Sequence, residues 1–165
     1  MLREIVFDTE TTGVNPASGD RIVEIGGIEL VNHIPTGRSY HVYLNPERSM
    51  PQEAFAVHGL SEEFLADKQL FAAIADDLHG FFDGARLVAH NAMFDLGFLN
   101  AEFARTGHAP IETGRIIDTL ALARRKQEAR RQPTRVERDV ALAADGGAID
   151  AVGFAHGGTW QERRG

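Results

Sequence analysis

The feature that most constrains this chain is a short apolar strand near the N-terminus that ends in two carboxylates. The strand formers at positions 5–7 lead directly into Asp8-Thr9-Glu10, which a Thr-Thr-Gly turn follows. Because side chains alternate along a strand, Asp8 and Glu10 should project from the same face, roughly 7 Å apart along the chain. Two carboxylates so placed repel each other, so we expect a shared proton, a cation or open water between them.

A hard divalent cation is the best of these partners, because carboxylate oxygens suit magnesium and manganese. The alternative is that Asp8 and Glu10 simply begin a polar loop. The segment 7–13, Phe-Asp-Thr-Glu-Thr-Thr-Gly, resembles the first motif of the DEDD-type 3′→5′ exonucleases, and most closely that of the epsilon-type proofreading subunits of bacterial replicative DNA polymerase. The Asp-x-Asp-x-Thr motif of haloacid-dehalogenase-like phosphatases fits less well, because it needs Asp where this chain has Glu10.

A second polar cluster follows the short apolar strand predicted at 86–89. It reads His-Asn-Ala-Met-Phe-Asp over 90–95 and opens a helix that should end near Gly107. Asp95 in the first turn of that helix is favourably placed against the helix dipole, which alone would account for it. The cluster also resembles the second motif of the same exonucleases. That resemblance implies that Asp95 is the third carboxylate of a metal site with Asp8 and Glu10.

The remaining pattern to position 126 predicts an α/β protein. Strands are expected at 21–31 and 39–44, separated by a turn at 32–37, and the pair Gly26-Gly27 indicates a bulge or a close backbone approach. Three successive strands suggest an antiparallel meander. A short helix at 51–60 and an amphipathic helix at 70–83 should follow. The resemblance implies an RNase H-like exonuclease fold: a mixed sheet with an antiparallel three-strand start and flanking helices.

A strand should turn into a helix at Asp118-Thr119, within a segment, 114–126, that also resembles the family. Asp118 is then either the N-cap of this helix or a support for the site. The resemblance further implies two divalent cations, Mg²⁺ or Mn²⁺, as cofactors. It makes Thr9, through its backbone amide, and His58, in a Val-His-Gly-Leu turn, contacts to the substrate.

Beyond Lys126 the resemblance stops, so we predict an exonuclease domain at 1–126, incomplete on its C-terminal side, and a divergent tail at 127–165. Seven basic residues lie within 124–138, a run typical of a solvated or disordered segment, and the end is glycine-rich. The family expects a helix with His and, five positions on, Asp. His156 is the only late histidine and is the candidate general base, but Gln161 stands where the carboxylate belongs. The tail is a divergence, a truncation or a shifted reading frame, and we expect weak activity at best.

The charge distribution bears on partners. Residues 1–123 carry 8 basic and 18 acidic side chains, a net charge of −10 within a total of −7. An acidic body is unsuited to holding duplex DNA by phosphate neutralisation alone, and suits an enzyme that meets phosphates through cations or is delivered by a partner. The resemblance implies a single-stranded DNA 3′ end and a DNA polymerase catalytic subunit as partners. With no apolar run long enough for a membrane span, no visible signal peptide and no cysteine, we expect a cytoplasmic protein.

Overall fold

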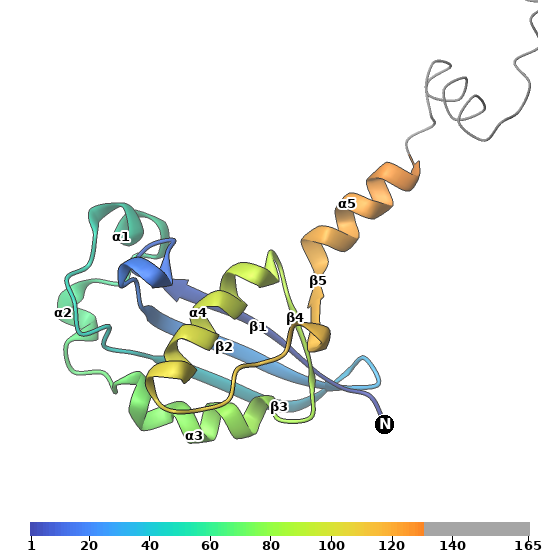
Figure 1. Ribbon diagram of the computed structural model, residues 1–165, viewed down its shortest axis with the longest axis horizontal. Coiled ribbons are helices and arrows are strands. Elements are labelled where there is room, and N and C mark those ends of the chain that lie inside the picture. The colour runs from blue at the N-terminus through green and yellow to red at the C-terminus, as the bar shows by residue number, and fades with distance from the viewer. Residues whose placement is uncertain (131–165) are drawn as a thin grey trace, which may run out of the picture. The chain divides into compact units, whose positions relative to one another are not determined.

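The computed structural model describes residues 1–130, and its centre is a five-stranded sheet with the order β3-β2-β1-β4-β5 (Figure 1). The strands are β1 (Arg3–Thr11), β2 (Ile22–Val31), β3 (Ile34–Tyr43), β4 (Arg86–Ala89) and β5 (Ile116–Asp118). The helices are α1 (Gln52–His58), α2 (Glu62–Leu65), α3 (Phe71–Phe82), α4 (Ala92–Arg105) and α5 (Thr119–Arg130). Short 3₁₀ helices lie at Pro16–Ser18 and Thr113–Arg115.

The sheet is mixed, as predicted. β1, β2 and β3 pair antiparallel, whereas β4 and β5 run parallel to β1. The turn between β2 and β3 is shorter than the one predicted at 32–37. Asn32 and His33 alone make it, both with positive φ, as in the tight turns that match strand twist. Pro35 belongs to β3, which tolerates proline because it is an edge strand of the sheet.

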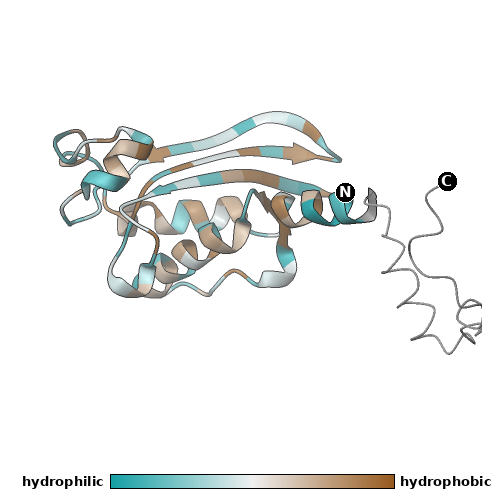
Figure 2. Ribbon diagram, turned by 90° about the horizontal axis from the view of Figure 1, so that it is seen from above, coloured by the Kyte–Doolittle hydropathy of each residue, from teal (hydrophilic) through white to brown (hydrophobic). Residues whose placement is uncertain are grey.

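One face of the sheet carries the hydrophobic core. Figure 2 shows the helices packed against one side of the three long strands, and Ile5 and Phe7 of β1 are buried there with residues of α3 and α4. The other face is more open within the described residues: Val6 on β1 and its cross-strand neighbour Ile28 on β2 are 39% and 48% exposed. The alternation along β1 therefore separates a core face from a face that continues into Asp8.

Gly27 serves a close approach, one of the two roles predicted for the glycine pair. A Cβ atom at Gly27 would lie 3.3 Å from Cε1 of Phe81 and 3.4 Å from Cγ2 of Ile5, so the bare backbone lets α3 pack against β2. The other predicted role, a bulge at the pair, is wrong. The register shifts of β2 fall opposite Glu10/Thr11 of β1 and between Ile28 and Leu30.

A buried ion pair fastens α4 to the start of β2. Glu102, 1% exposed, accepts hydrogen bonds at 2.6 Å and 3.0 Å from Nε and Nη2 of Arg21. The hydrogen bonds that Arg21 donates to Glu102 raise the pKa of Arg21 and so favour its charged form. The backbone of Arg21 also bonds to Thr12, the residue directly after β1: its carbonyl accepts from the Thr12 N–H, and its N–H donates to the Thr12 hydroxyl. The pair thus holds α4 and the end of β1 in one rigid frame.

We expect Glu102→Ala to lower the free energy of unfolding by about 3–5 kcal/mol, because it leaves the partly buried Arg21 guanidinium without its main partner. Chemical denaturation followed by circular dichroism measures this. Arg105→Ala is the matched control on the same helix, since it removes only a 3.4 Å contact to Glu102 at a more exposed position. Equal and small losses in the two variants would contradict the role given to the pair.

The chain divides into two compact units, Met1–Arg125 and Lys126–Gly165. Of the second unit, residues 126–130 are described, as the end of α5. His156 and Gln161 lie outside the described residues, so their predicted roles stay predictions. Among helices in residues 1–130, none has the length and apolar character needed to cross a membrane.

Candidate active site

Asp8 and Glu10 lie near the end of β1 on the same side of the strand, as the alternation predicted. Asp8 is exposed and Glu10 is half-buried, whereas Thr9 between them is buried against the helical layer. In the register of the sheet, Asp8 stands opposite Gly26 and Glu10 opposite Glu24 of β2. Because Gly26 has no side chain, the carboxylate of Asp8 is left open to solvent and to ligands.

Asp95 reaches β1 from the first turn of α4. It is 2% exposed, and its Oδ1 accepts hydrogen bonds from Oγ1 of Thr9 at 2.6 Å and from the Thr9 backbone N–H at 3.1 Å. The two family-like motifs, 86 positions apart, therefore meet at the side chain that separates Asp8 from Glu10. The same contact bears on the predicted substrate role of Thr9. Its backbone N–H, expected to meet a nucleotide, here donates to Asp95.

The carboxylates share one electrostatic environment. Burial raises the pKa of Asp95, the Thr9 hydroxyl opposes that rise, and the negative charge of Asp8 adds to it. Burial likewise raises the pKa of Glu10, His58 opposes the rise, and the charges of Asp8, Glu24 and Asp95 add to it. Such mutual repulsion favours either proton uptake or a bound cation.

These side chains do not form a preassembled metal cage. Within residues 1–130, no group of three or more His, Asp or Glu side chains is arranged so that it could hold a metal ion. The donor chemistry still fits a hard divalent cation, because the three groups are carboxylates with no arginine or lysine bonded to them among the described ion pairs. That Asp8, Glu10 and Asp95 ligate a common metal site stays a prediction.

His58 ends α1 and lies close enough to Glu10 to affect its pKa. Its Nδ1 accepts a 3.0 Å hydrogen bond from the backbone N–H of Leu60, so in the neutral ring Nε2 carries the proton. Nε2 is enclosed and has no hydrogen-bond partner among the described residues. A buried donor without a partner is costly, which makes Nε2 available to a ligand at the site.

Asp118 fills both roles that the sequence left open. Its Oδ1 accepts from the backbone N–H of Leu120 at 2.9 Å, which caps α5, and from that of Asn91 at 3.0 Å, which supports the loop before Asp95. Burial alone would raise the pKa of Asp118, but these backbone donors hold it below its usual range. His90 Nδ1 lies 3.2 Å from Oγ1 of Thr119, a contact that connects the end of β4 to the start of α5.

One contributor to the site was not predicted: Glu24. It stands opposite Glu10 in the β1–β2 register, helps to raise the pKa of Glu10, and lies 2.7 Å from Nε2 of His41. The sequence shows Glu24 as an acidic residue in the predicted second strand. Only the strand register shows that it lies opposite Glu10.

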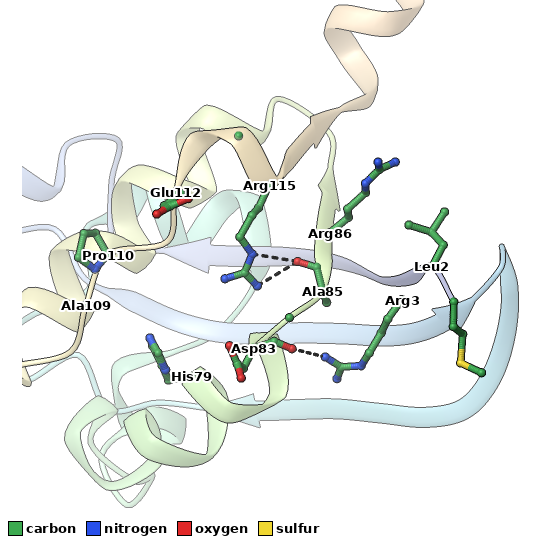
Figure 3. A pocket seen from close by; sticks show the side chains of 13 residues that line it. Leu2, Arg3, His79, Asp83, Ala85, Arg86, Ala109, Pro110, Glu112 and Arg115 are labelled. Carbon is green, nitrogen blue, oxygen red and sulfur yellow. Dashed lines mark hydrogen bonds between the residues drawn. The ribbon is translucent and has the colours of Figure 1, made fainter.

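A cavity of about 600 Å³ lies at the opposite end of the sheet, where β1 and β4 begin (Figure 3). Its arginines serve the fold. Arg115 donates to the carbonyl of Ala85, and Arg3 to that of Asp83, so both satisfy carbonyl groups at and after the end of α3. Asp8, Glu10 and Asp95 do not line this cavity.

Comparisons with known proteins identify the family of this chain. The sequence model of the RNase T family, described as exonuclease, matches residues 5–146. The chain belongs to this exonuclease family. The DNA polymerase III subunit epsilon of Rickettsia conorii is 55% identical over 126 residues, covering 74% of this chain and 55% of the relative. That of Escherichia coli K12 is 46% identical over 130 residues, covering 74% and 54%. This exonuclease-family chain thus spans about half the length of these relatives.

Solved structures of E. coli exonuclease I confirm the fold expected from the resemblance. A zinc-bound complex with single-stranded DNA matches 83% of this chain and 33% of that protein, with a TM-score of 0.71 at 20% identity. A metal-free complex matches 75% and 29%, with a TM-score of 0.68. The RNase H-like fold of these exonucleases is therefore the fold of residues 1–130.

Asp95→Asn should make the metal-free protein more stable at neutral pH, because it removes a repelled, buried charge but keeps an oxygen for Thr9. The raised pKa of Asp95 means that the folded state binds a proton more readily than the unfolded state. The wild type should therefore lose stability as pH rises through that pKa, and regain it on acidification. Thermal melts in chelator from pH 4 to 8 should show the two proteins converging at low pH. A gap that widens on acidification would contradict this.

Proposed function

We propose that this chain is a divalent-metal-dependent 3′→5′ exonuclease that hydrolyses phosphodiester bonds at single-stranded DNA 3′ ends and proofreads for a DNA polymerase catalytic subunit. The observation that carries the proposal is the docking of Asp95 on Thr9, between Asp8 and Glu10, where β1 meets α4 in a chain of the exonuclease family. Relatives named DNA polymerase III subunit epsilon support DNA as the substrate, a polymerase as the partner and the cytoplasm as the location.

Two divalent cations, Mg²⁺ or Mn²⁺, would supply an activated water and charge stabilisation at the phosphate. Asp8, the exposed carboxylate of β1, is suited to bridge them, and Glu10 and Asp95 to complete their ligands. These side chains must draw together on binding, since no ready cage exists among them. Relief of their repulsion favours that movement.

The substrate end would be held by residues around these carboxylates. The enclosed Nε2–H of His58 is a free donor beside Glu10 and suits a phosphate or terminal hydroxyl oxygen. Thr9 has its N–H and hydroxyl on Asp95, so any contact from it to a nucleotide requires a change in those bonds. His156, by its order along the chain, is the candidate to deprotonate the water.

Two alternatives compete with this proposal. An RNA-trimming exonuclease would use the same carboxylates. The family match does not distinguish a ribose-containing substrate from a deoxyribose-containing one. A binding module without activity is favoured by Gln161, which stands where the family expects a carboxylate.

A cleavage assay on the full chain tests all three. Single-stranded DNA and RNA of one sequence, labelled at the 5′ end, are incubated with protein and Mg²⁺ or Mn²⁺, with chelator as the blank. We expect a ladder shortening from the 3′ end of DNA, absent in chelator and in Glu10→Gln. Faster loss of RNA favours the trimming enzyme. Binding of DNA with no metal-dependent cleavage would contradict the proposal and favour the binding module.

A further inference from the structure

Thr9 holds Asp95 by hydrogen bonds to one carboxylate oxygen, and not merely by packing against it. Both donors of Thr9, its hydroxyl and its backbone N–H, converge on the same oxygen, Oδ1, at 2.6 Å and 3.1 Å. Both residues are buried, so water does not compete for these bonds. A carboxylate held through one oxygen by two donors has little freedom to rotate.

The other oxygen of Asp95 is left for a ligand. Oδ2 accepts no hydrogen bond from another residue in the described part of the chain. It is also not among the fully enclosed polar atoms that lack a partner, of which His58 Nε2 is the sole one described. Oδ2 therefore keeps access to the space beside the carboxylate. Neutral donors on one oxygen and an open second oxygen are what a metal-ligating carboxylate needs.

Glu102 on the same helix provides the contrast. That carboxylate is as buried as Asp95, but both of its oxygens are bound by the guanidinium of Arg21. A buried carboxylate with a purely structural role is thus fully paired on α4. Asp95, seven positions earlier, has no cationic partner among the ion pairs of residues 1–130.

The position of Thr9 in β1 determines where Asp95 lies relative to the other two carboxylates. Its side chain points to the helical layer, whereas those of Asp8 and Glu10 point to the other face of β1. The bond to Asp95 consequently ties the first turn of α4 to the strand at the midpoint between the two other carboxylates. A shift of this bond would move Asp95 relative to both.

We infer that Thr9 is a positioning residue: it clamps Oδ1 of Asp95 so that Oδ2 stays free to ligate a divalent cation together with Asp8 and Glu10. This role rests on the proposed function, because it presupposes metal binding by these carboxylates. In this role both donors of Thr9 serve Asp95, in place of the contact predicted between the Thr9 backbone amide and a nucleotide.

The test compares Thr9→Val, which keeps the shape but loses the hydroxyl, with Thr9→Ser, which keeps the hydroxyl. The control is Thr106→Val, which removes a threonine hydroxyl bonded to the Glu102 and Phe103 carbonyls at the far end of α4. Mn²⁺ binding to the full chain is measured by calorimetry, and KM and kcat on single-stranded DNA are measured alongside. If Thr9→Val does not fold, Thr9→Ala makes the same comparison.

Thr9→Val should weaken Mn²⁺ binding about 10- to 100-fold, the usual effect of losing a residue that orients a metal ligand, with KM for DNA nearly unchanged. Thr9→Ser should restore most of the affinity, and Thr106→Val should leave it as in the wild type. The inference is overturned if Thr9→Val binds Mn²⁺ like the wild type, if Thr106→Val weakens it equally, or if KM rises with metal affinity intact. A wild type that binds no Mn²⁺ overturns the proposed function itself.

Discussion

Replacing Asp8 with alanine should remove metal-dependent cleavage, by several powers of ten, while leaving the fold intact. Groups that act together at a metal site lose activity as a unit, so the loss should far exceed that of a single weak contact. In chelator, the variant should be as stable as the wild type or more so. Asp8 is exposed and raises the pKa of both Glu10 and Asp95, so its removal relieves repulsion and costs little packing.

Thermal melts in chelator and cleavage rates with Mn²⁺ measure the two halves of this expectation. Asp77→Ala is the matched control, since it removes an exposed carboxylate from α3 and should change neither quantity. A large loss of stability in metal-free Asp8→Ala would instead assign Asp8 a structural role.

Grafting a family-like helix in place of residues 127–165 should raise the cleavage rate by several powers of ten. The graft carries His and, five positions on, Asp, where this chain has Gln161 five positions after His156. It restores a general base, worth about 10²- to 10⁴-fold by itself, together with a fourth carboxylate that acts jointly with it.

The comparison is made on single-stranded DNA with Mg²⁺ and with Mn²⁺. A graft with alanine at both positions separates the chemistry of the two side chains from any effect of the new helix on stability. Equal rates for the natural chain and the full graft would show that His156, or another group, already fills the role.

Local sequence patterns predicted most of the fold because the decisive residues act locally. The strand at 86–89 and the turn into a helix at Asp118 lie where the pattern placed them. The start of β3 was missed because Pro35 and Gly37 are typical of a turn. Only the strand order shows that β3 is an edge, where such residues are tolerated.

The contacts within the candidate site could not be predicted from the sequence. Asp8, Glu10 and Asp95 were expected together from two motifs, yet the hydrogen bonds of Thr9 to Asp95 depend on how the first turn of α4 docks on β1. No local pattern carries that information, because the two residues are 86 positions apart. The enclosed Nε2 of His58 likewise follows from the turn at Leu60, which fixes the other nitrogen.

The position of Mn²⁺ in crystals of the full chain tests the central claim, that Asp8, Glu10 and Asp95 ligate a common metal site. We expect anomalous peaks at about 2.1–2.3 Å from carboxylate oxygens of all three, and, where two ions bind, a separation of about 3.5–4 Å. Asp95 should contribute Oδ2 while Thr9 keeps Oδ1. Manganese bound elsewhere, or an Asp95 that stays out of reach of a metal on Asp8, would contradict the account.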